Sequence, residues 1–173
     1  TTGTEQNIDA FPAPEDLWSR LNAEDPLSPG SEEVLLTPCY PNPDQTPRYY
    51  QQIAINRAVD AVLRGTPRIL LTMATGTGKT LVAFQICYKL WFSGWNRKGD
   101  PVRRPKILYL ADRNVLIDDP KDKCFAAFGD ARYKIENGEV VKSRDMYFAI
   151  YQAIAEDERR PGLYKEFDPD FFD

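Results

Sequence analysis

A glycine-rich segment between an apolar run and a helical pattern constrains the fold of this chain more than any other feature. Residues 68–73 read Arg-Ile-Leu-Leu-Thr-Met, a continuous apolar run typical of a strand buried on both faces. Residues 80–92 follow with apolar side chains at helical spacing. A strand, a tight loop and a helix in this order predict one unit of an α/β fold with a parallel sheet.

The loop has the residue types of a phosphate-binding loop. It reads Ala-Thr-Gly-Thr-Gly-Lys-Thr over residues 74–80, and its glycines let successive N–H groups face one point at a helix N-terminus. Lys79 is then expected to reach the β and γ phosphates, and the Thr80 hydroxyl to ligate Mg²⁺. The predicted nucleoside triphosphate site comprises Thr75, Gly76, Thr77, Gly78, Lys79 and Thr80, with Lys79 and Thr80 as its catalytic residues.

One position departs from the usual form of this loop. Met73 stands five residues before Gly78, where the motif usually has its first glycine. The alternative is a glycine-rich turn that precedes a Lys-Thr pair by chance. The apolar run and the helical pattern on either side argue against that alternative.

Strand and helix patterns alternate through the rest of residues 47–173. A helix is predicted over residues 48–64, with Gly65 in the position that ends it and Ile53, Ala54, Ala58, Ala61 and Val62 facing inward. Asn137-Gly138 predicts a hairpin turn between short segments. The other predicted elements are strands over 106–111 and 146–150 and helices over 120–129 and 151–158. The pattern indicates a parallel sheet flanked by helices.

Residues 1–46 differ in composition from the remainder. They hold seven of the 14 prolines and nine acidic side chains, but one basic side chain, Arg20. Residues 14–21 form a pattern for a short helix, and the following residues up to Pro47 have turn chemistry. We predict an acidic, proline-rich connector over residues 1–46 and an α/β domain over residues 47–173.

Composition excludes some classes of protein and leaves others open. No apolar stretch is long enough to span a membrane, and no signal peptide is visible. Three widely spaced cysteines and no histidine speak against a structural metal and favour a reduced, cytoplasmic setting. Residues 47–173 carry 21 basic and 17 acidic side chains, a balance that permits nucleic-acid contact without requiring it.

A short motif upstream of the loop points to adenine. Residues 48–54 read Arg-Tyr-Tyr-Gln-Gln-Ile-Ala and resemble the Q-motif of superfamily 2 helicases and translocases, in which a glutamine amide reads the adenine edge. The resemblance assigns that role to Gln51, with Arg48 and Tyr50 in the same site. The alternative is an exposed polar helix start with an aromatic anchor.

Two further motifs of that superfamily follow predicted strands. Leu-Ala-Asp-Arg-Asn-Val-Leu over residues 110–116 resembles motif Ia and makes Arg113 and Asn114 candidates for contact with a DNA backbone. The alternative there is an Asp N-cap beside a solvated arginine. Gln152 follows the strand over 146–150 in the place of motif Ic and is a weaker DNA candidate, because Ile150 stands where the family often has a hydroxyl.

The whole set of motifs resembles the motor (R) subunit of type I restriction enzymes. It comprises residues 11–18 (Phe-Pro-Ala-Pro-Glu-Asp-Leu-Trp), 48–52, 73–80, 109–116 and 147–152. The resemblance implies an ATP- and Mg²⁺-dependent translocase that pulls and cleaves double-stranded DNA, with methylation and specificity subunits as partners. It also implies a RecA-like first lobe, here truncated before the strand of motif II, which is expected just after Asp173.

The resemblance also implies what this chain lacks. Hydrolysis needs a carboxylate near Mg²⁺ and usually an arginine from a second lobe, and the Asp-Glu pair of motif II, the arginines of motif VI and the nuclease residues are missing from the sequence. The chain alone is therefore expected to bind ATP with little or no turnover.

Three alternatives compete with this interpretation. A small kinase should have an arginine-rich lid and a GTPase an Asn-Lys-x-Asp base reader, and the sequence has neither. Another superfamily 2 DNA or RNA helicase or a DNA-repair ATPase is the nearer alternative, and residues 11–18 argue against it. A non-catalytic module with a vestigial loop is disfavoured by the intact Lys79-Thr80 pair.

Overall fold

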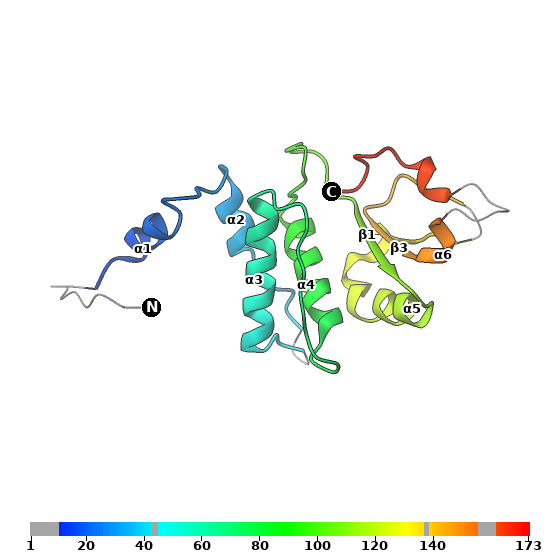
Figure 1. The fold of residues 1–173 in the computed structure, drawn as a ribbon, viewed down its shortest axis with the longest axis horizontal. Coiled ribbons are helices and arrows are strands. Elements are labelled where there is room, and N and C mark those ends of the chain that lie inside the picture. Colours follow the sequence, from blue (N-terminus) through cyan, green and yellow to red (C-terminus); the bar gives the residue numbers. More distant parts are fainter. Residues whose placement is uncertain (1–10, 43–44, 137–138, 156–161) are drawn as a thin grey trace.

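The computed structural model describes residues 11–42, 45–136, 139–155 and 162–173, which form a helical half and a sheet half side by side (Figure 1). The sheet has three parallel strands in the order β1-β3-β2. The elements in chain order are α1 (Pro14–Leu21), α2 (Ser31–Leu36), α3 (Tyr49–Leu63), α4 (Lys79–Phe92), β1 (Ile107–Ala111), α5 (Val115–Asp122), η1 (Cys124–Ala131), β2 (Arg132–Lys134), β3 (Met146–Ile150), α6 (Tyr151–Ile154) and η2 (Leu163–Glu166).

The central strand β3 is buried because it has a neighbour on each side. Ile107 of β1 and Arg132 of β2 both pair with Met146 at its start. Met146 to Ala149 are fully buried, whereas the residues of β1 and β2 are half-buried, as edge strands are. The strands predicted over 106–111 and 146–150 are confirmed.

Each face of the sheet has its own apolar cluster. Phe148 points to one face, where it packs with side chains from α4, α5 and η1, including Phe84, Ile117 and Phe125. Tyr147 points to the other face and packs edge-on against the rings of Phe167, Phe171 and Phe172. The alternation follows from the two-residue period of a strand.

Helix α4 joins the two halves of the molecule. Its Val82 and Leu90 pack with Ile55 and Val59 of α3 and with Val34 of α2. Another face of α4 meets the sheet through Phe84. The helices predicted over 48–64 and 80–92 are confirmed, and Gly65 follows α3 with a φ of 74° as expected.

The predicted inward face of α3 is wrong in part. Ile53 was expected to face inward but is about half exposed, while Ile55, Val59 and Leu63 are buried. Apolar residues cover much of the surface of α3, so its pattern allows more than one inward face. The positions of α2 and α4 decide which face is used.

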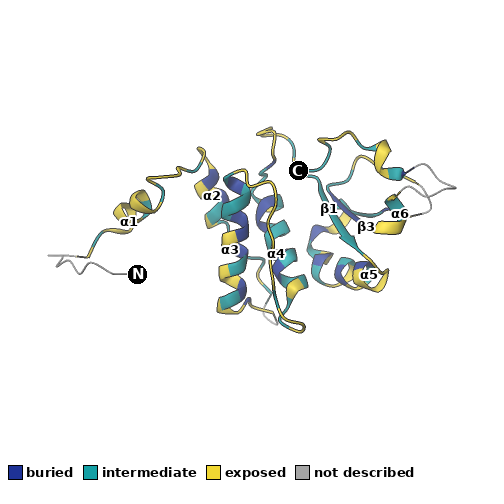
Figure 2. Cartoon of the chain, in the orientation of Figure 1, coloured by how far each residue is buried: buried dark blue, intermediate teal, exposed yellow. Residues whose placement is uncertain are grey.

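The strand predicted over residues 68–73 does not form. These residues are extended, but no strand in the described ranges pairs with them, and Figure 2 shows the connection from α3 to α4 as largely exposed. Leu70 is 90% exposed. An apolar run becomes a buried strand only where neighbouring strands complete its hydrogen bonds and cover its faces.

Other predicted elements are corrected in position. The helix predicted over 120–129 is two elements, α5 and η1, and Pro120 lies inside α5 two residues before its end. The predicted hairpin lacks its second strand, because residues 139–141 form no strand. The Glu139 N–H donates to the Glu136 carbonyl at 3.2 Å, while Asn137-Gly138 itself lies outside the described residues. Helix α6 covers only the start of the predicted 151–158 segment, whose residues from 156 on are also outside the described ranges.

The connector contains one confirmed helix and one that the sequence did not reveal. Helix α1 spans the predicted residues and lies apart from the body of the molecule (Figure 1). Helix α2 was not predicted; it packs on α3 and α4, and Ser31 and Val34 are buried there. Part of the connector therefore belongs to the core of the helical half. Among the described residues no helix is long and apolar enough to cross a membrane.

Candidate nucleotide site

The predicted phosphate-binding loop joins the extended residues 68–73 to α4. Gly76 has a φ of 80° and Gly78 a φ of 83°, a region that only glycine adopts without strain. Helix α4 begins at Lys79, directly after the second glycine. The backbone N–H groups of its first turn have no partners within the helix, so they are available to an anion.

Side chains of the loop hold its curled shape. The Thr77 hydroxyl donates to the Ala74 carbonyl at 2.6 Å. The exposed Lys79 ammonium donates to the same carbonyl at 3.1 Å and to the Met73 carbonyl at 3.3 Å. These carbonyls are weak partners for a full charge, and a phosphate oxygen would compete with them effectively. Thr75 is exposed at the start of the loop.

Gln51 connects the start of α3 to the loop. Its Oε1 accepts the Arg48 N–H at 2.8 Å, and its Nε2 donates to the Thr77 carbonyl at 2.7 Å. The residue is 95% buried. Gly78 leaves room for this contact, because a Cβ there would lie 2.5 Å from Gln51 Nε2. The structure thus brings the two predicted motifs together.

A cavity of about 380 Å³ lies between α3 and the loop. The predicted residues Arg48, Tyr50 and Gln51 line one side, with the Arg48 guanidinium donating to the Tyr50 hydroxyl at 3.4 Å. A larger hollow of about 680 Å³ lies at the opposite ends of α3 and α4, away from the loop. The smaller cavity is lined by Gln45, Thr46, Arg48, Tyr50, Gln51, Gly76, Thr77, Gly78, Thr80, Leu81 and Cys124.

The Thr80 side chain faces the sheet half of the molecule. It lies close enough to the Tyr109 hydroxyl of β1 for the two side chains to interact. Burial, with smaller effects of the neighbouring Cys87 and Cys124 thiols, raises the pKa of Tyr109, so this hydroxyl stays protonated at neutral pH. Burial also raises the pKa of the Cys124 thiol, which lines the cavity.

Five residues of this site were missed in the sequence, one of them Leu81, which follows Thr80 in α4. Gln45 and Thr46 come from the connector, and Cys124 from η1. Their sequence neighbourhoods carry no motif, so nothing marked them in advance. Tyr109 lies in a strand that was predicted, but a strand pattern does not show which side chain meets Thr80.

The candidate DNA residues lie elsewhere, at the carboxyl ends of two neighbouring parallel strands. Arg113 follows β1, and its side chain is 80% exposed beside Asp112. Asn114 is exposed and precedes the first residue of α5. Gln152, also exposed, lies in α6 just after β3. Because β1 and β3 are paired in parallel, all three residues lie at one edge of the sheet.

The residues of the loop fit a triphosphate and Mg²⁺. The fit rests on three features: two glycines at positive φ, a lysine at the start of α4, and a threonine hydroxyl at the second position of that helix. The loop would hold phosphate oxygens through its N–H groups and Lys79, and Thr80 would hold Mg²⁺.

Fold and site together define a truncated RecA-like α/β lobe. Comparison with known proteins identifies its family. The model of the family described as type III restriction enzyme, res subunit, matches residues 44–173, and the chain belongs to that family.

Two kinds of relative confirm the resemblance to type I restriction enzyme R subunits. The chain is 40% identical over 167 residues to the type I restriction enzyme EcoAI endonuclease subunit of Escherichia coli, and 36% identical over 96 residues to the EcoKI endonuclease subunit of strain K12. A solved fragment described as an HsdR subunit of a type I restriction enzyme, from Vibrio vulnificus YJ016, is 53% identical with a TM-score of 0.79.

The chain covers only part of each relative. The EcoAI match takes in 96% of this chain but 20% of that subunit, and the EcoKI match 56% of this chain but 7% of that subunit. The match to the solved fragment takes in 99% of this chain and 29% of the fragment. The chain therefore corresponds to a limited portion of an HsdR-like subunit.

Proposed function

We propose that this chain is the ATP-binding portion of a DNA translocase, the motor subunit of a type I restriction enzyme, in which ATP hydrolysis drives movement along double-stranded DNA before cleavage. The observation that carries the proposal is the contact between the two motifs: Gln51 at the start of α3 binds the carbonyl of Thr77 in the phosphate loop. A base-side motif and a phosphate-side motif thus share one cavity.

The proposed roles follow from the chemistry of each group. Lys79 would neutralise charge on the β and γ phosphates, and the N–H groups at the start of α4 would bind phosphate oxygens. Mg²⁺, held through the Thr80 hydroxyl, would offset phosphate charge as it builds up during transfer. Arg48, Tyr50 and Gln51 would hold the adenine.

Turnover requires groups beyond this cavity. Among the described residues, none that lines it is a carboxylate, and hydrolysis needs one near Mg²⁺ as well as a group that positions water. We therefore propose that this chain binds ATP with little or no hydrolysis. Robust ATP hydrolysis by the purified chain would contradict this part of the proposal.

The DNA-facing part of the proposal concerns the carboxyl edge of the sheet. Arg113, Asn114 and Gln152 would contact the phosphate backbone of double-stranded DNA there, because all three are exposed at one edge. The methylation and specificity subunits of a type I complex and a cytoplasmic location complete the proposal, by analogy with the relatives.

Binding of fluorescent ATP and GTP analogues with Mg²⁺ tests the nucleotide site. Lys79→Ala should weaken binding of both at least tenfold, because a charge-assisted contact to phosphate is lost. Gln51→Ala should weaken both, since the loop loses a support, and should also erase the preference for adenine. The matched control is Gln52→Ala, whose side chain is exposed one residue further along α3.

The ratio of the two affinities separates the roles of Gln51. A lost preference for ATP with Gln51→Ala supports adenine reading. Equal binding of ATP and GTP by the unsubstituted chain would refute the assignment of Gln51 as the base reader. A folded chain that binds neither analogue would refute the nucleotide site itself.

A further inference from the structure

The connector is fastened to the nucleotide-site helix by buried polar side chains. Gln85 of α4 is fully buried; its Oε1 accepts the Tyr40 N–H at 2.7 Å and its Nε2 donates to the Tyr40 carbonyl at 3.3 Å. The amide therefore pairs with the backbone of the connector at two points. We call residues 31–42, which run along α4 here, the strap.

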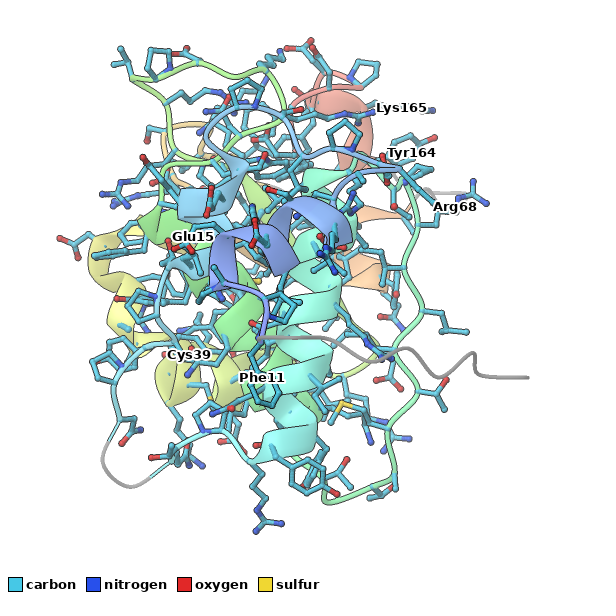
Figure 3. All side chains as sticks on the ribbon, turned by 90° about the vertical axis from the view of Figure 1, so that its left-hand side faces the viewer. Phe11, Glu15, Cys39, Arg68, Tyr164 and Lys165 are labelled. Atoms are coloured by element: carbon cyan, nitrogen blue, oxygen red, sulfur yellow. The ribbon has the colours of Figure 1, made fainter. Side chains whose placement is uncertain are left out.

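A second buried side chain holds the strap one helical turn further along α4. The Lys89 ammonium, 97% buried, donates to the Leu35 carbonyl at 2.8 Å and to Asn56 Oδ1 at 3.2 Å. Residues i and i+4 lie on one face of a helix, so Gln85 and Lys89 bind the same segment. Figure 3 places Cys39 of the strap and Arg68 of the extended run on opposite sides of α3.

These contacts fix the position of the strap as well as its attachment. Burial lowers the pKa of Lys89, which shows that its charge is costly to place there. Apolar side chains already attach the strap, since Val34 lies in the core of the helical half. Buried polar groups with complete partners add a defined register, because any shift of the strap leaves them unsatisfied.

Residues that follow the strap in the chain form part of the wall of the nucleotide cavity. Tyr40 packs edge-on against Phe84 and Tyr88 of α4, with ring centroids 5.6 and 5.1 Å apart. A few residues later Gln45 and Thr46 line the cavity opposite the phosphate loop. The helix that begins at the phosphate loop therefore holds the strap, and the residues that follow the strap border the space that a nucleotide would fill.

We propose that Gln85 and Lys89 are positioning residues, which couple the docking of the strap on α4 to occupancy of the nucleotide site. The inference rests on the proposed function of that site. A nucleotide that contacts a wall built by Gln45 and Thr46 binds best when the strap is docked, and by linkage it keeps the strap docked. Any segment attached ahead of the strap would then respond to nucleotide without touching it.

Three native cysteines report separately on the strap, the nucleotide cavity and the core of the molecule. Cys39 lies in the strap, partly buried against the helical half, and burial raises the pKa of its thiol, so opening of the strap should speed its alkylation. Cys124 lines the nucleotide cavity and reports binding directly. Cys87 lies within α4, and burial raises the pKa of its thiol to about 12, so its slow alkylation reports the integrity of the core.

The experiment measures alkylation of each cysteine by mass spectrometry of peptides, with and without a non-hydrolysable ATP analogue and Mg²⁺. We expect the analogue to slow alkylation of both Cys124 and Cys39, the latter about fivefold or more, the lower end of typical coupling between sites. Alkylation of Cys87 should not change.

A variant of the strap contact provides the reciprocal measurement. Lys89→Met should speed alkylation of Cys39 and weaken analogue binding about fivefold by the same linkage. Loss of the ammonium alone would slow that alkylation, because Lys89 lowers the pKa of Cys39, so a faster reaction reports opening. Lys142→Met, at an exposed lysine of the sheet half, is the matched control and should change neither quantity.

The outcomes separate this inference from the proposed function. Protection of Cys124 without protection of Cys39 would overturn the coupling and leave the nucleotide site intact. Absence of protection at Cys124 would overturn the nucleotide site, and the coupling with it. Faster alkylation of Cys39 in Lys89→Met with unchanged analogue affinity would show that Lys89 is purely structural and would also overturn the coupling.

Discussion

Two apolar runs of similar length each precede a candidate functional segment, and they are held in different ways. Met146–Ile150 lies between two strands, is buried, and precedes α6 with Gln152. Residues 68–73 are extended and exposed and precede the phosphate loop. Helix α6 is positioned by a sheet, whereas the phosphate loop depends on α4 and on side chains from other elements.

The difference shows what anchors the phosphate loop in this chain. Gln51 binds the loop from α3. The Tyr109 hydroxyl of β1 lies close enough to Thr80 for the two side chains to interact. Helix α4, which packs against both halves, fixes the direction of the loop's last residues. A phosphate loop can therefore keep its shape where the preceding run has no paired neighbour, provided that its glycines and these contacts are intact.

The largest expected effect is a loss of stability, and it distinguishes β3 from residues 68–73. Phe148→Ala removes a fully buried ring of β3 that packs on Phe125 and Tyr109, and it should lower the free energy of unfolding by about 3–5 kcal/mol. Leu70→Ala, at an exposed position of the other run, should change it by less than about 0.5 kcal/mol. Urea unfolding of both variants measures the difference, and similar losses would refute the contrast.

The next effect tests the glycine that makes room for Gln51. Gly78→Ala places a Cβ 2.5 Å from Gln51 Nε2 at a φ of 83°, so we expect ATP-analogue binding to weaken at least tenfold. Gly99→Ala is the matched control, since Gly99 also has a positive φ, 67°, but has open space around it. If both variants bind the analogue equally well, the Gln51 contact does not shape the loop.

A smaller effect concerns the link from the loop to the sheet. Tyr109→Phe removes the hydroxyl that interacts with Thr80 while keeping the ring, which packs on Phe125 and Phe148. One hydrogen bond contributes about 1 kcal/mol, so Mg²⁺-dependent binding of the ATP analogue should weaken about fivefold. Titration of Mg²⁺ at a fixed analogue concentration measures this weakening. An unchanged Mg²⁺ dependence would mean that Thr80 is positioned without Tyr109.

The smallest expected effect on stability is at Leu70, where a substitution should instead change the self-association of the chain. Leu70→Lys puts a charge on the exposed run, where it should alter the free energy of unfolding by less than about 0.5 kcal/mol. Unpaired extended edges with apolar side chains favour self-association, and a lysine opposes it. Sedimentation velocity over a range of concentrations should show less self-association in the variant, and a fully monomeric unsubstituted chain would contradict this expectation.

Strong periodic patterns and motif chemistry were sufficient for much of the fold. Helices α1, α3 and α4 and strands β1 and β3 form where the patterns predict them. Helix α2 was missed because its six residues, Ser-Glu-Glu-Val-Leu-Leu, are too few to show a period, and its place is decided by packing on α3 and α4. The helix predicted from residue 120 begins earlier, because α5 starts at Val115 and includes Pro120.

The sequence by itself determined the composition of the candidate site: a glycine-rich loop, Lys79 and Thr80, and an upstream glutamine motif, because backbone freedom and side-chain chemistry are local properties. Only the tertiary structure decided which apolar run became a strand, which amide was buried against the loop, and that Gln85 and Lys89 hold the strap. Those outcomes depend on neighbours distant in the chain, and pairing, burial and hydrogen-bond satisfaction are properties of such contacts.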